Sequence, residues 1–474
     1  MTDLPPVLTP AYRLVIRLEI DNRPGMFAEV AKTIGARGGS LGAIDLVEAT
    51  ASKHVRDVTV DVPDEATGEE LTADLHAMKG VVVRSVSDRT FLMHLGGKVA
   101  MAGRVAVRNR DDLSLVYTPG VARVSMAIAA DPERSWALTQ RANAIAIVSD
   151  GTAVLGLGNV GPLAALPVME GKSLLFADLA GVSAFPIVIE PGTVEQTVDA
   201  IARISVGFGG INLEDIAAPA CFEIERKLRA RLEIPVFHDD QHGTAIVVLA
   251  ALRNAAAVCG VAFESLRVVV LGAGAAGSGT ARLLRTAGVT RLVVADRHGT
   301  VTTPRKDLND EKRALAEELG TTGPSRSLGD ALNGANVLIG LSGPRLVSIE
   351  MVRTMARPRI VFAMANPDPE VDPIAAAAEV DVMATGRSDF PNQVNNVLAF
   401  PGVFRGLLDA RASTVTTNME LAAAVALADS VPAAHRSAEY ILPSVFDAQV
   451  VPAIAKAVTA AAHADGVARA RVKA

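Results

Sequence analysis

The stretch Arg267-Val-Val-Val-Leu-Gly-Ala-Gly-Ala-Ala-Gly277, followed by Ser-Gly-Thr-Ala-Arg-Leu-Leu, decides the fold of this chain. Its apolar residues 268–271 predict a buried strand, and residues 278–287 predict a helix. Between them, Gly272, Gly274 and Gly277 allow a tight turn and a close approach of the backbone to a ligand. A buried strand, a glycine turn and the N-terminus of a helix together bind the pyrophosphate of a dinucleotide. We therefore predict a Rossmann-type domain that binds NAD or NADP.

An acidic residue follows this motif at the spacing of a ribose ligand. Asp296 comes directly after the predicted strand 291–295, where its carboxylate can accept both ribose hydroxyls and would repel a 2′-phosphate. Arg297 and His298 follow immediately and could instead pair with that phosphate. The sequence favours NAD and leaves NADP open.

A second glycine motif, Gly156-Leu-Gly-Asn-Val-Gly161, has the same spacing in a different context. It comes after the turn pair Asp150-Gly151, and Pro162 and Pro167 follow it, so it lacks the strand, tight turn and unbroken helix that surround the first motif. We interpret it as close backbone packing near the active site and not as a second dinucleotide site.

Composition restricts the function. Half of the 474 residues are hydrophobic and 21% are charged, which is typical of a well-packed α/β enzyme of two or three domains. The net charge is −6 without a basic run, so we expect no nucleic-acid partner. The uncharged stretch 151–169 contains four glycines and two prolines, which argues against a membrane span. Because the N-terminal residues do not show the pattern of a signal peptide, we expect a cytoplasmic protein.

Three domains are expected. Residues 1–95 read as strand, helix, two strands, helix and strand, which is the ferredoxin-like βαββαβ order. Residues 96–250 alternate strands and helices and would form the catalytic domain, and residues 251–474 would form the Rossmann domain with C-terminal helices. The strands expected in the middle domain are 144–148, 173–177, 211–213 and 234–238.

Two acidic pairs stand at the ends of predicted strands. Glu214 and Asp215 follow the strand 211–213. Asp239 and Asp240 follow the next strand. Either pair alone could simply cap a helix. Because the carboxyl ends of neighbouring parallel strands meet at one edge of a sheet, their joint placement favours a site for a divalent cation.

Six segments resemble, in the right order, the motifs of malic enzymes. They are Val116-Tyr-Thr-Pro-Gly-Val121, Ser149-Asp-Gly-Thr-Ala-Val-Leu-Gly-Leu-Gly-Asn159, Met169-Glu-Gly-Lys172, Asn212-Leu-Glu-Asp-Ile216, Phe237-His-Asp-Asp-Gln-His-Gly-Thr244 and Phe390-Pro-Asn-Gln-Val-Asn-Asn-Val-Leu-Ala-Phe-Pro-Gly402. The resemblance spans roughly residues 100 to 450 and is closest to the smaller bacterial type. It implies oxidative decarboxylation of L-malate to pyruvate and CO2, with NAD or NADP as oxidant.

The resemblance also implies residue roles. Tyr117 matches the general acid that protonates the enol, and Lys172 matches the general base, with Asp239 beside it. Mn²⁺ or Mg²⁺ is implied, with ligands at Glu214, Asp215 and Asp240. Asn366 and Asn396 match the amides that hold malate, and Asn366 also borders the dinucleotide. The arginine that holds a malate carboxylate in animal malic enzymes is replaced by Ala153, so the group that holds the second carboxylate stays open.

The turn Asp21-Asn22-Arg23-Pro24-Gly25 resembles the signature of ACT domains. Such modules commonly pair and bind amino acids, which implies a homodimer or larger oligomer and a small amino- or organic-acid effector. Asn22 and Gly25 would contribute to that regulatory site, because the turn places backbone N–H groups at a helix start. The domain could alternatively serve assembly alone.

Two other functions compete with this interpretation. An ACT-linked amino-acid dehydrogenase would also have a catalytic lysine and a late Rossmann domain, but it needs no carboxylate cluster. An amino-acid sensor with a decayed enzyme core is the second alternative, although every expected catalytic position is occupied.

Overall fold

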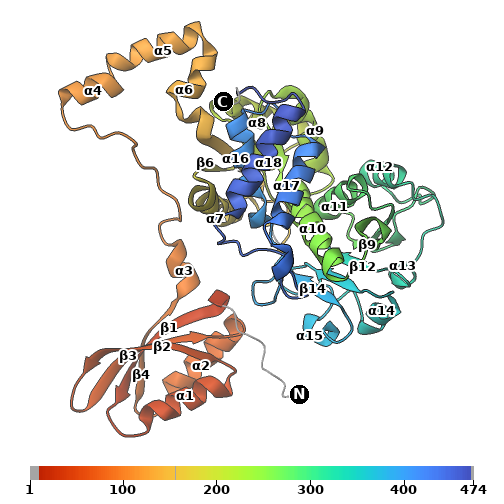
Figure 1. Cartoon of the computed structure of the whole chain (residues 1–474). Coiled ribbons are helices and arrows are strands. Elements are labelled where there is room, and N and C mark those ends of the chain that lie inside the picture. Colours follow the sequence, from red (N-terminus) through yellow and green to blue (C-terminus); the bar gives the residue numbers. More distant parts are fainter. Residues whose placement is uncertain (1–9, 155, 471–474) are drawn as a thin grey trace. The chain divides into compact units, whose positions relative to one another are not determined.

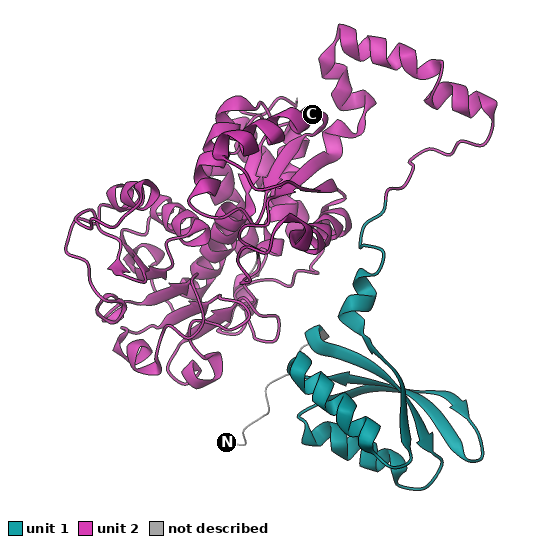
Figure 2. Cartoon of the chain, turned by 180° about the vertical axis from the view of Figure 1, so that it is seen from behind, with its two compact units in different colours: residues 1–100 teal, residues 101–474 magenta. Residues whose placement is uncertain are grey.

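The computed structural model describes residues 10–154 and 156–470 (Figure 1). Contacts divide the chain into two compact units, residues 1–100 and residues 101–474, which Figure 2 colours separately. Each unit has its own hydrophobic core.

Unit 1 is a four-stranded antiparallel sheet with two helices, α1 (Met26–Ala36) and α2 (Glu65–Ala77). Its strands lie in the order β2-β3-β1-β4, and the chain follows the βαββαβ order read from the sequence. The bounds are β1 (Arg13–Asp21), β2 (Ser40–Ala49), β3 (Lys53–Asp61) and β4 (Val81–Asp88), followed by α3 (Arg89–His94). The core lies between the sheet and the helices, because the alternate residues Ile16, Leu18 and Ile20 are buried against them.

Unit 2 contains two parallel sheets. The first has the order β6-β5-β7-β8, and its strands are β5 (Ala144–Ser149), β6 (Ser183–Val188), β7 (Gly210–Leu213) and β8 (Val236–His238). The helices between and after them are α7 (Pro162–Ala180), α8 (Val194–Ile204), α9 (Ala220–Arg231) and α10 (Asp239–Val258).

The strand expected at residues 173–177 is wrong, because this segment lies inside α7. Its residues are nearly all apolar, and a short apolar run does not distinguish a buried strand from a buried helix. The true strand, β6, begins ten residues later at Ser183.

The second sheet has the order β11-β10-β9-β12-β13-β14. Its strands are β9 (Arg267–Leu271), β10 (Arg291–Asp296), β11 (Gly299–Thr300), β12 (Val337–Gly340), β13 (Ile360–Ala363) and β14 (Val382–Thr385). All neighbours pair in parallel except β10 and β11. The helices are α11 (Ala275–Thr286), α12 (Asp310–Leu319), α13 (Leu328–Leu332), α14 (Ile349–Thr354) and α15 (Pro373–Ala376). The order reverses next to β9, at the end of which a Rossmann domain binds its ligand, so the predicted domain is confirmed.

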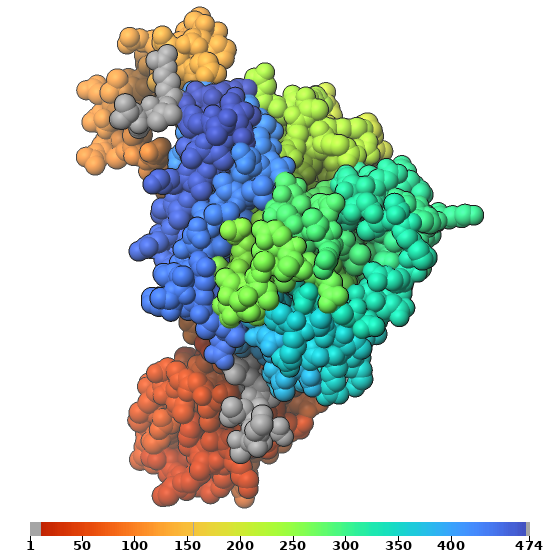
Figure 3. Space-filling model, turned by 45° about the vertical axis from the view of Figure 1, so that its right-hand side comes forward, coloured from red at the N-terminus to blue at the C-terminus, as the bar shows by residue number. Residues whose placement is uncertain are grey.

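Helix α10 connects the two sheets and is buried along most of its length. It packs against α11 and against α17 (Thr417–Asp429), which belongs to a C-terminal group with α16 (Phe400–Ala410) and α18 (Val450–Ala464). On the face seen in Figure 3, these C-terminal helices (blue) lie beside the chain near residue 250 (green). The residues that begin α10 are therefore held in a rigid core.

The segment before the first sheet of unit 2 is different. Helices α4 (Arg110–Val116) and α5 (Gly120–Ala130) contain no buried residue, and α6 (Ser135–Leu138) follows them. Among the described residues, the stretch 110–130 alone is long and apolar enough to cross a membrane by length and composition. None of it is buried within the chain, so this arm presents an apolar surface without a partner in the same chain.

Candidate active site

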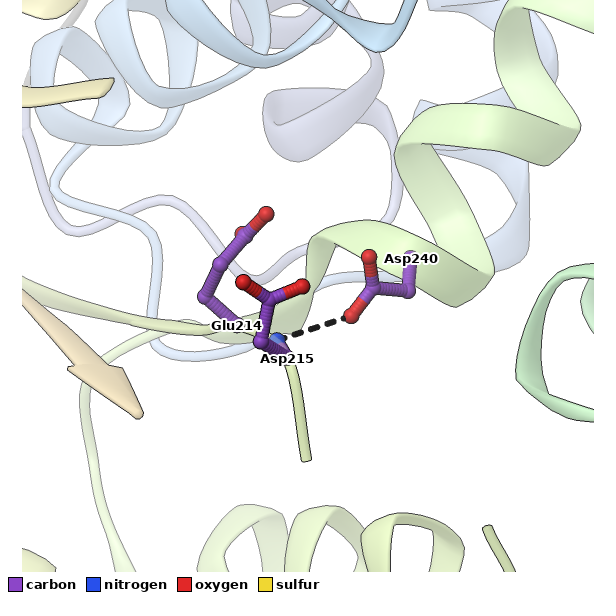
Figure 4. Close-up of side chains that lie close together, drawn as sticks. All are labelled: Glu214, Asp215 and Asp240. Atoms are coloured by element: carbon purple, nitrogen blue, oxygen red, sulfur yellow. Dashed lines mark hydrogen bonds between the residues drawn. The ribbon is translucent and has the colours of Figure 1, made fainter. Parts of the chain in front are cut away.

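Three carboxylates meet where β7 and β8 end (Figure 4). Glu214 and Asp215 follow β7, and Asp240 is the second residue of α10. One oxygen from each lies within 4.8 Å of the others. The backbone N–H of Asp215 donates to Asp240 Oδ2 at 3.0 Å, which fixes the two strand ends to each other. The predicted convergence of these side chains is found, and such a set of hard oxygen donors fits Mg²⁺ or Mn²⁺.

Lys172 lies beside this cluster on the buried face of α7. It shares that face with Met169 and Phe176, at the three- and four-residue spacing of a helix stripe. Its Nζ lies 2.6 Å from Glu214 Oε2, also contacts Asp239 Oδ2, and sits 4.5 Å from the centre of the Phe400 ring. The lysine is 7% exposed, so its charge is balanced by protein groups and not by water.

The electrostatics of this site are dominated by burial and by excess negative charge. Burial lowers the pKa of Lys172, but the neighbouring carboxylates, Asp239 first, outweigh it and raise the pKa above the usual lysine value. Burial raises the pKa of Asp239 to about 7 and also raises that of Glu214. Without a cation, Lys172 is therefore held protonated, whereas a general base must be able to lose its proton near neutral pH.

Asn396 contacts this site, and so does the segment that leads into the second glycine motif, residues 156–161. The Asn396 amide donates to Asp239 Oδ2 at 2.5 Å, so this predicted residue is brought to the lysine pair. The backbone N–H of Ala153 donates to Asp215 O at 3.0 Å. A Cβ on Gly156 would lie 2.1 Å from the carbonyl oxygen of Asn366, so glycine is required for this close approach. The close backbone packing predicted for this motif is found at Gly156, and Asn366 lies against it.

Among residues 10–154 and 156–470, no hydrogen bond or ion pair joins the Tyr117 side chain to the lysine–carboxylate site. It follows the last residue of α4, and 66% of its surface is exposed, whereas Lys172 is buried. The expectation that both residues act in one site stays a prediction. The arm that carries Tyr117 buries none of its residues in α4 and α5, so its own chain does not hold it in place.

The dinucleotide motif has the expected form. Gly272 follows β9 and has φ 120°, and Gly274 precedes α11. A Cβ on Gly277 would lie 1.9 Å from the carbonyl oxygen of Gly272. The tight turn therefore requires glycine here.

Asp296 ends β10 as predicted, but its carboxylate is already engaged. Oδ1 accepts from the His298 backbone at 2.9 Å and from Arg305 at 2.8 Å. Oδ2 accepts from Arg305 at 3.2 Å and from Lys312 at 2.6 Å. Since a carboxylate has about four acceptor positions, a ribose hydroxyl would have to displace one of these donors.

Five further polar residues form a network behind the cluster that the sequence analysis did not predict. They are His238, Gln241, His242, Glu225 and Glu420. Both oxygens of Glu225 lie within 3.0 Å of His242 Nε2, and His242 Nδ1 lies 2.9 Å from Glu420 Oε1. Although burial raises it, the Glu225 pKa is lowered to about 2, chiefly by His242. His238, Gln241 and His242 adjoin Asp240 in one motif, but no sequence signal connects them with Glu225 or Glu420.

In unit 1 the turn residues line a pocket of about 420 Å3. Gly25 precedes α1 with φ 84°, and the Asn22 amide donates to the backbone oxygens of Thr50 and Ala51. Three basic side chains also line the pocket: Arg23, His54 and Arg56.

Comparison with known proteins gives consistent matches. Residues 97–197 match a profile described as the malic enzyme N-terminal domain, and residues 241–463 match the malic enzyme NAD-binding domain. The NAD-dependent malic enzyme of Geobacillus stearothermophilus is 48% identical over 97% of this chain and 96% of its own length. The NADP-dependent malic enzyme of Halomonas elongata is 46% identical over 79% of this chain and 92% of its own length. The crystal structure of malic enzyme from Pyrococcus horikoshii superposes with a TM-score of 0.76 at 44% identity, covering 80% of this chain and 89% of that one.

Proposed function

Because the chain belongs to the malic enzyme family, we propose that its buried lysine–carboxylate site carries out the reaction of that family. The protein oxidatively decarboxylates malate with reduction of NAD or NADP. The observation that carries the residue assignment is the buried contact of Lys172 with Glu214 and Asp239, beside three converging carboxylates.

We propose that Mn²⁺ or Mg²⁺ binds at Glu214, Asp215 and Asp240. These three side chains offer only oxygen ligands, which is the donor set that both ions prefer. When bound, the ion stabilises the negative charge that develops on the 2-oxo oxygen during decarboxylation. It also offsets part of the negative charge that raises the Lys172 pKa.

Lys172 would take the proton of the C2 hydroxyl while the hydride passes to the nicotinamide. Its Nζ is buried, lies 2.6 Å from Glu214 Oε2 of the proposed cation site, and is held in position by Asp239. Asn396, which donates to Asp239, and Asn366 would hold the malate oxygens. The second product-forming step needs an acid that delivers a proton to C3 of the enol, and Tyr117 would supply it.

For Tyr117 to act, we propose that the enzyme is at least a dimer in which the α4–α5 arm of one copy reaches the site of another. The arm exposes Leu115, Val116 and Met126, and burying such side chains would stabilise an interface. Near the start of α7 the chain exposes Leu157 and Leu163, which provide an apolar surface beside the site for a partner's arm.

We propose that the Gly272 loop holds the pyrophosphate of the dinucleotide. The relatives include NAD- and NADP-dependent enzymes, so the family does not decide between them. In this chain Arg297 follows Asp296 at the end of β10 and is placed to pair with a 2′-phosphate.

For unit 1 we propose an ACT-like regulatory role, with a small amino or organic acid bound at the turn. Arg23, His54 and Arg56 line the pocket together with one carboxylate, Asp21, which is paired with Lys53, so the lining favours a carboxylate ligand. Strand β2 exposes Ile44 and Leu46, a surface through which two copies would pair. The cytoplasmic location stays a prediction.

The test is malate-dependent formation of reduced cofactor, with Mn²⁺ present and with the metal removed by EDTA. Turnover that requires metal supports the proposal. Turnover of an amino acid without metal would indicate the dehydrogenase alternative, and no turnover of either would indicate a sensor. Adding amino acids and dicarboxylates to the intact enzyme, and to a variant with Gly25→Val, tests the regulatory site.

A further inference from the structure

A series of buried polar side chains leads away from the proposed metal site. It begins at His238, the last residue of β8, and ends at a pocket of about 300 Å3 lined by residues of α9, α10, α11 and α17. His238 is fully buried, and Gln241 is 3% exposed. A buried polar group normally has a hydrogen-bond partner, so the orientation of each group can be worked out from its neighbours.

The orientation of the Gln241 amide is determined by Glu225. The Gln241 side-chain nitrogen lies 3.1 Å from Glu225 Oε2, and a carboxylate can only accept a hydrogen bond. The side-chain amide of Gln241 therefore faces Glu225 with its nitrogen and not with its oxygen. His242 approaches both oxygens of Glu225, with Nε2 at 2.8 and 3.0 Å, and holds the carboxylate in this position.

The same Gln241 nitrogen also determines the tautomer of His238. It lies 3.1 Å from His238 Nδ1, and an amide nitrogen donates but does not accept. Nδ1 of His238 is therefore the acceptor, and the ring carries its hydrogen on Nε2. That Nε2 is buried, lies 3.4 Å from Asp240 Oδ2, and has no hydrogen-bond partner among residues 10–154 and 156–470.

We propose that His238 is a positioning residue for Asp240: its Nε2–H group, 3.4 Å from Asp240 Oδ2, would donate to that oxygen when the carboxylate holds a cation. Gln241, itself oriented by Glu225, sets the tautomer that places the hydrogen there. In that state Asp240 Oδ2 would accept from this group as well as from the backbone N–H of Asp215, which already donates to it at 3.0 Å. Hydrogen bonds to a ligating carboxylate fix its direction, and their loss typically weakens metal binding about 10- to 100-fold. The inference rests on the proposed metal site.

The outer end of the series gives this arrangement its rigidity. His242 lies between Glu225 and Glu420, which come from α9 and α17, so the three side chains connect two helices across α10. Gly279 of α11 also packs here, since a Cβ at this position would lie 2.6 Å from the carbonyl oxygen of Gln241. The start of α10 is thereby enclosed by the helix that follows the dinucleotide loop.

Titration of the metal-free protein with Mn²⁺ alone, followed by calorimetry, tests the proposal without turnover. His238→Leu removes the donor at similar size and should weaken Mn²⁺ binding about 10- to 100-fold. His238→Gln keeps an N–H near the place of Nε2 and should stay within about threefold of the wild type. Glu318→Gln is the control, because Glu318 lines the same pocket but pairs with Arg282 outside the series. NAD affinity should be unchanged in all three.

Long-range ¹⁵N–¹H correlation of histidine-labelled protein gives a second measurement, in which His238 should show hydrogen on Nε2 alone. Gln241→Met should remove the preference of His238 for hydrogen on Nε2. If His238→Leu does not fold, Gln241→Met replaces it in the Mn²⁺ binding test. Any of three results would overturn the proposal. They are an equal loss of Mn²⁺ affinity in His238→Leu and His238→Gln, an unchanged Mn²⁺ affinity in His238→Leu, and a wild-type His238 ring that carries its hydrogen on Nδ1. If the wild type itself binds no Mn²⁺, the metal site is wrong, which is a distinguishable result.

Discussion

Replacing Lys172 with Met removes the proposed general base and keeps most of the side chain's apolar length. General-base catalysis contributes typically 10²- to 10⁴-fold, and no second lysine contacts the cluster among the described residues, so kcat should fall by about that factor. The loss should be in kcat more than in the dinucleotide affinity, because Lys172 belongs to α7 and the glycine loop belongs to the other sheet.

The same variant should bind Mn²⁺ more tightly. In the wild type the Lys172 ammonium lies 2.6 Å from Glu214 Oε2. A cation bound at Glu214 is therefore repelled by the lysine charge, unless Lys172 first loses its proton, which also costs free energy. Two unit charges roughly 5 Å apart interact by about 3 kcal/mol at an effective dielectric constant of about 20. Relaxation and solvent reduce this value, but a gain of at least about tenfold in affinity should remain.

Calorimetric Mn²⁺ titration and the absorbance of the reduced cofactor measure the two effects separately. Lys227→Met is the matched control, because Lys227 is an exposed lysine of α9 that pairs with Glu195 and Glu223. It should change neither quantity. Weaker Mn²⁺ binding in Lys172→Met, or activity close to that of the wild type, would refute the assignment of Lys172 as the base beside the metal.

Three further predictions concern the second copy, pH and the cofactor. If each active site takes Tyr117 from the partner copy, mixing the inactive variants Tyr117→Phe and Lys172→Met under conditions of subunit exchange should restore about a quarter of wild-type activity. The reason is that half of the dimers would be mixed, and each mixed dimer would contain one intact site. No recovery of activity, with exchange shown by mass spectrometry, would argue for a site within one chain. Because the raised pKa of Asp239, about 7, lies above its unfolded value, the folded metal-free protein binds the extra proton, and its free energy of unfolding should fall as pH rises from about 4 to 7. Urea unfolding in EDTA should show a steeper fall of the unfolding free energy with pH for the wild type than for Asp239→Asn. Equal slopes in the two proteins would contradict this role of Asp239. Arg297→Glu should lower kcat/KM for NADP at least about tenfold more than for NAD, because it repels the 2′-phosphate; equal losses would exclude a role in cofactor choice.

The parts of this enzyme that follow from local patterns were predictable. The glycines at 272, 274 and 277 lie in a strand–turn–helix because each step has its own sequence signal. The acidic residues after β7 and β8 converge because parallel strands end at one edge. The strand expected at 173–177 was wrong because its apolar run has no helical period, although Lys172 still faces the core from α7.

Other features depend on contacts that no local pattern encodes. Glu225 holds His242 from the preceding helix α9, and Glu420 holds it from α17, far along the chain. Each alone reads as an ordinary helix glutamate. The four donors that fill the Asp296 carboxylate include Arg305 and Lys312, which the ribose argument from sequence did not consider. Tyr117 was recognised by its motif, but its position relative to Lys172 depends on a surface that a single chain does not bury.

The charge balance of the site explains why the buried lysine, the carboxylates with raised pKa values and the proposed cation site occur together. Lys172 contacts Glu214 and Asp239, and Glu214 clusters with Asp215 and Asp240, so four carboxyl groups share one lysine in the metal-free site. Burial of unbalanced charge is costly, which is the reason that carboxyl pKa values rise here and that the lysine proton is held. A divalent cation relieves both effects at once, because it balances the carboxylates and weakens their hold on the lysine proton. Malate would add two further negative charges, so the same reasoning requires the cation to bind before, or together with, the substrate.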